Sequence, residues 1–79
     1  MKANEFIEIR PDIMLGKPVI KGTRIPVELI IRKLGEGGTI EDLIDGYPSL
    51  RSEDLVNAWA YFRTHRDEIE QQIRKNEEA

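Results

Sequence analysis

Apolar residues recur with the spacing of an α-helix in three stretches of the chain. The first stripe consists of Val27, Ile30, Ile31 and Leu34. This i, i+3, i+4, i+7 spacing places the side chains on one face of a helix, and Glu28, Arg32 and Lys33 fall on the opposite, polar side. Pro26 suits the first turn, because its φ is already helical and its missing N–H would have no partner there. The pattern predicts a helix over about 26–36.

A second helix is predicted over about 39–46. Its apolar stripe is formed by Ile40, Leu43, Ile44 and Tyr47. Thr39 and Asp42 resemble a capping box, in which the side chain of each residue accepts a hydrogen bond from the backbone N–H of the other. We expect Gly46 to adopt the left-handed conformation that commonly ends a helix.

The third predicted helix is the longest and runs over about 52–74. The Ser52 side chain can cap its start. Its inward stripe keeps one phase without a break and is formed by Leu55, Ala58, Trp59, Phe62, Arg66, Ile69 and Ile73. Val56 and Ala60 widen the apolar face near the start. The tail from Gln71 to Ala79 is polar and has no C-cap signal, so we expect it to fray or to become ordered on a partner.

Two short β-prone runs precede the helices, EFIEI at residues 5–9 and PVI at residues 18–20. Partial alternation and β-branched residues are typical of strands, and the segment between the runs holds a proline and a glycine that suit a turn. We therefore predict a two-stranded β-ribbon over about 5–20. The chain reads as one domain over 1–79, mainly α-helical, with a three-helix bundle of helix-turn-helix type preceded by this short ribbon.

The length of 79 residues limits how the fold can be stabilised. A chain of this size buries only about 60% of its extended surface, and without cysteine it can form neither a disulfide nor a thiolate zinc site. Self-association remains as a means of stabilisation, so we predict a homodimer. Its expected contacts are three ribbon residues and two aromatic residues of the third helix, namely Ile7, Ile9, Val19, Trp59 and Phe62.

Several function classes find no support in the composition. The single histidine, His65, lies between charged residues and reads as a solvated side chain, and the acid pairs that open the second and third helices are explained by the helix dipole. We therefore predict no catalytic residues, no cofactor and no metal site. No apolar run approaches the roughly 18 residues of a membrane span, and the N-terminus lacks a signal-peptide core, so we expect a cytoplasmic protein.

Charge is distributed unevenly along the chain. The net charge of −3 argues against strong nonspecific binding to nucleic acid. However, residues 17–33 hold five basic residues and one acid, a balance of +4, whereas residues 36–54 hold six acids and one arginine, a balance of −5. The basic footprint is therefore local.

Within that footprint, the turn Lys21-Gly22-Thr23-Arg24 supports two interpretations. Glycine beside basic residues suits an anion site, because backbone N–H groups can approach an oxyanion closely where no Cβ intervenes. The same residues suit a plain turn, with a positive φ at Gly22, a local hydrogen bond from Thr23, and Arg24 paired with an acid of the same fold. Composition alone favours the internal ion pair, and the spacing is not that of a phosphate-binding P-loop.

The last two predicted helices fit a helix-turn-helix, with 39–46 as the bracing helix and the helix from residue 52 as the recognition helix. Glu53 and Asp54 at its start would repel the phosphate backbone, which counts against this interpretation. The candidate DNA contacts, taken from the basic turn and this helix, are Lys21, Thr23, Arg24, Arg51, Ser52, Asn57 and Arg63.

The run GKPVIKGTRIPVELIIRKL, at residues 16–34, resembles the domain-of-unknown-function family 433, whose members look like VapB-type antitoxins. Further matching features are Gly38-Thr39-Ile40-Glu41-Asp42-Leu43, Tyr47-Pro48-x-Leu50 and Glu53-Asp54-Leu55. The resemblance extends over about residues 5–65. It implies a homeodomain-like three-helix bundle that binds DNA or RNA, a tendency to dimerise, and a PIN-like ribonuclease toxin as partner. Leu15 departs from the family pattern, because many relatives have a histidine there.

Three functions remain open. The resemblance implies the antitoxin of a type II toxin-antitoxin pair, a dimer that binds operator DNA, represses its own operon and neutralises the PIN-like ribonuclease. The alternative is a dimeric protein–protein adaptor that does not bind DNA, which the acidic helix starts favour. A small anion-binding or catalytic domain is the third function, and it rests on the basic turn alone.

Overall fold

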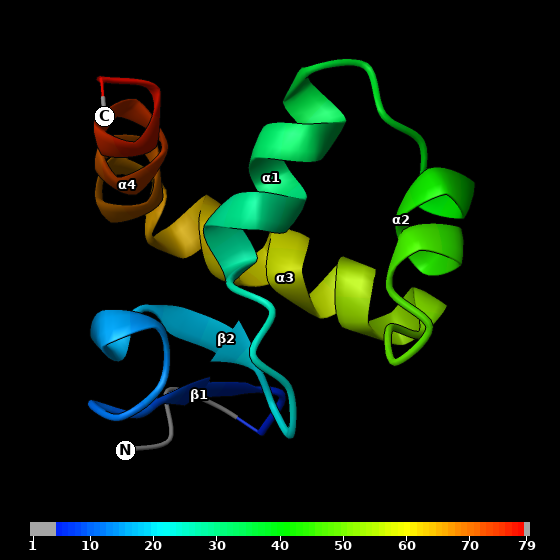
Figure 1. Ribbon diagram of the computed structural model, residues 1–79, viewed down its shortest axis with the longest axis horizontal. Helices are drawn as coiled ribbons and strands as arrows, with labels where there is room; N and C mark the ends of the chain where they lie inside the picture. Colours follow the sequence, from blue (N-terminus) through cyan, green and yellow to red (C-terminus); the bar gives the residue numbers. More distant parts are fainter. Residues whose placement is uncertain (1–4, 79) are drawn as a thin grey trace.

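In the computed structural model, which describes residues 5–78, two short strands lie against a layer of helices (Figure 1). The elements, in chain order, are β1 (Ile7–Ile9), a 3-10 turn (Met14–Gly16), β2 (Pro18–Ile20), α1 (Val27–Gly35), α2 (Ile40–Gly46), α3 (Ser52–Thr64) and α4 (Arg66–Glu78). Figure 1 shows α1 in the centre above α3, with α2 and α4 on opposite sides. None of the helices in the described part of the chain is long and apolar enough to cross a membrane.

The predicted β-ribbon is confirmed. β1 and β2 pair antiparallel, with Ile7 opposite Ile20 and Ile9 opposite Pro18. The ribbon packs under α1 and α3, so that Ile7 and Val19 have no exposed surface. A single two-stranded ribbon is marginal in water, and the helices supply the apolar surface that it needs.

The first two helices begin close to their predicted positions. α1 starts at Val27, and Pro26 precedes it in an extended conformation with φ −72° and ψ 148°. The Thr39–Asp42 capping box at the start of α2 is present as predicted. The prediction for Gly46 is wrong, because Gly46 ends α2 as a helical residue and the glycines with positive φ in the described chain are Gly16, Gly22 and Gly37.

The predicted single helix over 52–74 is wrong, since the structure divides it into α3 and α4 at His65. Near the break, the hydroxyl of Thr64 donates to the carbonyl oxygen of Tyr61 at 3.1 Å, and the His65 N–H donates to the carbonyls of Tyr61 and Phe62. The Thr64 side-chain bond competes with the regular helical ladder, whereas the bond from the His65 N–H to Tyr61 is the last of that ladder. The break lets α4 turn back against α1, which buries Ile69 completely. The chain thereby covers part of its own wide apolar face.

Most of the polar tail is helical, because α4 continues to Glu78. Its sequence is rich in residues of high helix propensity, and Asp67 and Glu68 in the first turn favour the helix dipole. The fold therefore has four helices within the described residues, where the sequence predicted three.

One core is shared by the ribbon and all four helices. Its buried members are Ile7, Ile20, Ile25, Val27, Ile30, Ile31, Leu43, Leu50, Leu55, Ala58, Tyr61, Phe62 and Ile69. Glu28, which the helical pattern placed on the polar side of α1, is also buried. Its carboxylate lies 3.5 Å from Lys17 Nζ and 3.9 Å from Arg32 Nε. A buried carboxylate requires such partners because its desolvation is costly.

Candidate nucleic-acid interface

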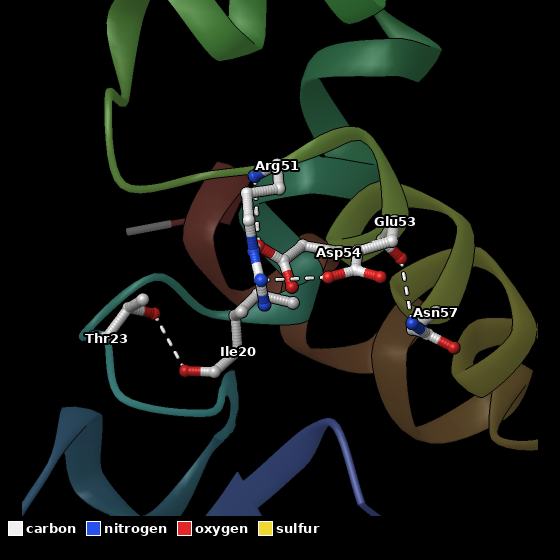
Figure 2. Close-up of polar contacts among 6 residues, drawn as sticks. All are labelled: Ile20, Thr23, Arg51, Glu53, Asp54 and Asn57. Atoms are coloured by element: carbon white, nitrogen blue, oxygen red, sulfur yellow. Dashed lines mark hydrogen bonds and ion pairs between the residues drawn. The ribbon is translucent and has the colours of Figure 1, made fainter.

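The basic turn between β2 and α1 is held by a network of short hydrogen bonds. Gly22 has φ 78°, the left-handed region that glycine enters without a steric penalty. The Thr23 hydroxyl donates to the carbonyl oxygen of Ile20 at 2.8 Å (Figure 2) and accepts from the N–H of Ile25 at 3.0 Å. The backbone N–H of Lys21 donates to the carbonyl of Phe6 in the segment before β1 at 2.9 Å. Thr23, a predicted DNA contact, therefore has its hydroxyl engaged within the turn.

The two basic side chains of this turn point to solvent. Lys21 and Arg24 are exposed, and neither forms an ion pair with another residue in the described part of the chain. The internal partner that composition favoured for Arg24 is thus not found among residues 5–78. Lys17 and Arg32, by contrast, are held by Glu28. The local excess of positive charge is displayed at the turn itself.

The start of α3 is organised around Asp54, which is 4% exposed. The backbone N–H of Arg51 donates to Asp54 Oδ2 at 2.9 Å, and Arg51 Nε lies 3.7 Å from the same oxygen (Figure 2). Arg51 Nη1 also lies 2.9 Å from Glu53 Oε1. Ser52 is the first residue of the helix and not its cap, so the prediction of Ser52 as the N-cap is wrong. Asp54 instead supplies part of the cap, because its carboxylate accepts the hydrogen bond from the backbone N–H of Arg51.

Asn57 lies one turn further along α3. Its side-chain amide donates to the carbonyl oxygen of Glu53 at 2.8 Å (Figure 2). That bond uses one amide hydrogen and leaves the other hydrogen and the carbonyl oxygen. Arg63, the last candidate DNA contact, is exposed near the end of α3. It lies about two helical turns beyond Asn57 and therefore far along α3 from the helix start.

A hollow of about 430 Å³ brings the turn and the start of α3 together. Its lining residues are Glu5, Phe6, Lys21, Gly22, Arg51 and Asp54. Two basic side chains and two acids meet there, so the hollow carries no net excess of positive charge. The structure thus gathers part of the predicted DNA-contact set at one edge of the molecule. The free positive charge at this edge belongs to Lys21 and Arg24, because Arg51 is engaged by two acids.

The five predicted dimer contacts divide sharply by exposure. Ile7 and Val19 have no exposed surface, and Phe62 is 7% exposed. These three side chains are core residues of the subunit and present little surface to a second copy. Ile9 is half-buried. Trp59 is 48% exposed and lies with its ring centroid 5.5 Å from that of Phe62.

An apolar groove that the sequence interpretation did not find lies beside Trp59. Its volume is about 280 Å³, and its lining residues are Leu34, Ile40, Leu55, Val56 and Trp59. Ile40 is 52% exposed and Val56 68% exposed. Helical spacing assigned Ile40 to the core-facing stripe, and only the relative placement of α1, α2 and α3 shows that it borders an open surface. The available signal in the sequence was the wide apolar face near the start of the third predicted helix, to which Val56 and Trp59 belong.

His65 lies directly after α3, where its side chain contacts Tyr61 and Thr64. Its ring stacks on Tyr61 with centroids 3.9 Å apart and planes 5° apart, and its Nδ1 lies 2.8 Å from Thr64 Oγ1. Burial raises the pKa of the Tyr61 hydroxyl above 10.0, with a further contribution from the charge of Glu68. Within residues 5–78, no group of three or more histidine or acidic side chains is placed to hold a metal ion. This cluster ends α3.

Comparison with known proteins identifies similar chains. The model of the family described as "Protein of unknown function (DUF433)" matches residues 7–62. The "Uncharacterized protein y4eO" of Sinorhizobium fredii is 36% identical over 59 residues, which make up 75% of this chain and 27% of that protein. The chain thus spans about a quarter of the length of that relative. The crystal structure of a DUF433 member protein from Anabaena variabilis matches with a TM-score of 0.83 and 34% identity, over 86% of this chain and 67% of that one.

Proposed function

This chain belongs to the DUF433 family. We propose that it is a DNA-binding antitoxin, because its basic turn lies beside the start of α3 and forms no ion pair within residues 5–78. In this proposal, α2 and α3 serve as a helix-turn-helix. The protein binds the operator of its own operon and neutralises a PIN-like ribonuclease encoded with it. The DNA-binding role is supported by the exposed basic turn, whereas the toxin partner is supported by the family resemblance alone.

The observation that carries the DNA-binding proposal is the state of Lys21 and Arg24. Both are exposed and without an ion pair among the described residues, on a turn whose backbone is fixed by Thr23 and Gly22. Because the backbone of the turn is already ordered, binding a phosphate there orders only the two side chains. Contacts to the phosphate backbone position a protein on DNA and provide much of the affinity. We assign the principal phosphate contacts to these two residues.

The test is a gel-shift titration of the full chain on the DNA upstream of its own gene, at two salt concentrations, with random DNA as reference. Replacing Arg24 by Ala should weaken binding roughly 3–10-fold at low salt and lower the salt slope by about one, as expected for one phosphate contact. The melting temperature should stay unchanged. Lys33→Ala is the matched control, because Lys33 is an exposed base at the far end of α1.

If the unaltered chain binds upstream DNA no tighter than random DNA at either salt, the operator proposal fails. If Arg24→Ala lowers the melting temperature and leaves DNA binding intact, Arg24 is a structural residue. Either result is independent of whether a ribonuclease partner exists.

A second candidate function is a protein–protein adaptor that does not bind DNA. The observation in its favour is the acidic start of α3, where Arg51 is engaged by Glu53 and Asp54 and a phosphate would meet two carboxylates. Co-purification with the product of the adjacent gene, combined with an absent gel shift, would support the adaptor. A complex that still shifts operator DNA would support the antitoxin.

A further inference from the structure

The hollow between the basic turn and the start of α3 contains a hydrogen-bond acceptor that the fold does not use. Asp54 lines this hollow, and its side chain is only 6% exposed. Its Oδ2 accepts a hydrogen bond from the backbone N–H of Arg51 at 2.9 Å. Its Oδ1 accepts no hydrogen bond from any residue between 5 and 78, and it is not sealed from solvent. This oxygen is therefore available to a ligand that donates a hydrogen bond.

Arg51 places a donor beside this acceptor. The Arg51 side chain lies against Asp54 (Figure 2), with Nε 3.7 Å from Asp54 Oδ2 and Nη1 2.9 Å from Glu53 Oε1. Nη2 has no acceptor in the described part of the chain, and it carries two N–H groups. Asp54 and Arg51 thus offer an acceptor next to a donor.

This pair of groups matches one edge of two nucleic-acid bases. Cytosine and adenine present an amino group next to an unprotonated ring nitrogen, so that the amino group can donate to a carboxylate oxygen while the ring nitrogen accepts from a guanidinium. Uracil and thymine present a carbonyl next to an N–H on the same edge. Against the hollow, each of these groups would meet a group of its own kind.

Phe6 and Gly22 give the hollow a lining that suits a flat ring. Phe6 is half-buried, and its backbone carbonyl accepts from the Lys21 N–H at 2.9 Å, which holds it beside the turn. Aromatic side chains commonly stack on unpaired bases. Apart from its chain neighbours, no atom lies within 4 Å of the position that a Cβ of Gly22 would take, so a ligand can approach the turn closely. The volume of about 430 Å³ is within the usual range for small-molecule sites.

Lys21 supplies the cation that a nucleotide needs for its phosphate. Its side chain is exposed and forms no ion pair with a described residue, and it lines the same hollow. Glu5, the remaining charged residue of the lining, is exposed and can turn its carboxylate to solvent. The hollow therefore combines an acceptor, a donor, an aromatic ring and one unpaired cation.

We propose that this hollow binds an unpaired nucleotide whose base is cytosine or adenine. The amino group donates to Asp54 Oδ1, and the ring nitrogen accepts from Arg51 Nη2. The base stacks on Phe6, and the phosphate pairs with Lys21. The nucleotide is unpaired, because a base in a duplex already uses this edge. A free mononucleotide and a single strand both offer this chemistry. Competition with operator DNA for Lys21 rests on the proposed function, whereas nucleotide binding itself does not.

The test is isothermal titration calorimetry of the full chain, without duplex DNA, using CMP, AMP and UMP as probes. CMP and AMP should bind about tenfold more tightly than UMP, because only their bases match the acceptor and the donor. Asp54→Asn should remove most of this preference, since the amide oxygen can still accept from Arg51 while its NH2 group replaces Oδ1. Asp42→Asn is the matched control, because Asp42 has the same position in α2 and lies outside the hollow.

Two further variants test the ring and the phosphate contacts. Phe6→Leu should weaken CMP and UMP alike, by about five- to tenfold, because stacking does not depend on the identity of the base. Lys21→Ala should lower the affinity for CMP to that for cytidine, whereas Lys33→Ala, at the far end of α1, should have no effect. A short thymine strand with one central cytosine distinguishes the two sources. Tighter binding than CMP identifies a strand as the ligand, and equal binding identifies a free nucleotide.

The proposal is overturned if none of the probes binds or if CMP and UMP bind equally to the unaltered chain. It is also overturned if the preference survives in Asp54→Asn with an unchanged circular dichroism spectrum. The comparison of CMP with UMP on the unaltered chain decides the question even if a variant does not fold. A failed gel shift on operator DNA would leave these results unaffected, so the two proposals fail separately.

Discussion

The starts of α2 and α3 use an aspartate at the same helical position for different purposes. In both helices the aspartate accepts a hydrogen bond from the backbone N–H three residues earlier, at 3.0 Å from Thr39 to Asp42 and at 2.9 Å from Arg51 to Asp54. The Thr39 hydroxyl accepts a second bond from the backbone N–H of Asp42 at 3.1 Å, whereas the Arg51 side chain has no acceptor for the N–H of Asp54. Asp42 is exposed and Asp54 is buried.

The difference in burial between Asp42 and Asp54 means that the start of α2 is a local capping motif, whereas the start of α3 also depends on tertiary packing. The start of α2 is completed by two residues that are close in sequence and open to water. The start of α3 depends on a carboxylate held inside the fold, and its partner Arg51 extends toward the hollow shared with Lys21 and Gly22. A substitution at α2 should therefore affect one helix end, whereas a substitution at α3 should also affect the candidate interface.

The largest expected effect is at Asp54. Replacing it by Ala should lower the free energy of unfolding by about 2 kcal/mol, because the partly buried Arg51 N–H loses its acceptor and a small cavity is left. The same substitution at the exposed Asp42 should cost less than about 1 kcal/mol. Urea denaturation of both variants measures the difference, with Asp54→Asn, which keeps an acceptor oxygen, as the control. Equal losses at the two aspartates would remove the distinction.

Thr39→Ala should have the next largest effect. The loss of a hydroxyl N-cap typically costs about 1 kcal/mol, and Thr39 is exposed, so no cavity should add to it. Thermal unfolding should show a lower melting temperature, and Thr39→Ser should stay close to the unaltered chain. An unchanged melting temperature for Thr39→Ala would mean that the reciprocal bonds at α2 contribute nothing.

Arg51→Ala should change stability by less than about 0.5 kcal/mol, because its side chain is exposed and its ion pairs are screened by solvent. The backbone N–H that Asp54 accepts remains in this variant. The gel-shift assay tests a second role of this side chain. A loss of DNA affinity in Arg51→Ala at constant melting temperature would show that Arg51 exchanges its ion pairs with Glu53 and Asp54 for a DNA phosphate. A large loss of stability would instead make its side chain part of the helix cap.

Ser52→Ala should have the smallest effect, within about 0.3 kcal/mol of zero, because Ser52 occupies the first helical turn, where alanine is well tolerated. This variant is the direct counterpart of Thr39→Ala. A loss of about 1 kcal/mol at Ser52 would indicate that its hydroxyl caps α3 in solution, and the contrast between the two helix starts would fail. Melting curves of the two variants under identical conditions make the measurement.

Much of the fold could be read from local patterns. The ribbon strands, the position of α1 after Pro26, the capping box of α2 and the positive φ at Gly22 all follow from residues that are near one another in sequence. The break at His65 could not be read in this way, because the apolar stripe keeps its helical phase through it. Whether a helix continues or turns back depends on what its far half can pack against, and here α1 receives Ile69.

The candidate site shows the same limit. The residues of the basic turn were identified from sequence. Which of the basic side chains form ion pairs could not be predicted, because ion pairing depends on which acids lie nearby in space. Glu28 engages Lys17 and Arg32 and leaves Lys21 and Arg24 without a partner among the described residues. The apolar groove was missed because Ile40 and Leu34 have the spacing of core residues, and three helices must be placed before their exposure is visible.

By itself, the sequence determined which segments form strands and helices and where most of them begin, because propensities, caps and glycine turns act over a few residues. Tertiary structure alone decided which charges are neutralised, which apolar side chains stay exposed and where the long helix divides. These properties depend on burial and on distances between segments far apart in the chain. Asp42 and Asp54 have the same position in their helices, and only the packing around them makes one a local cap and the other a buried anchor.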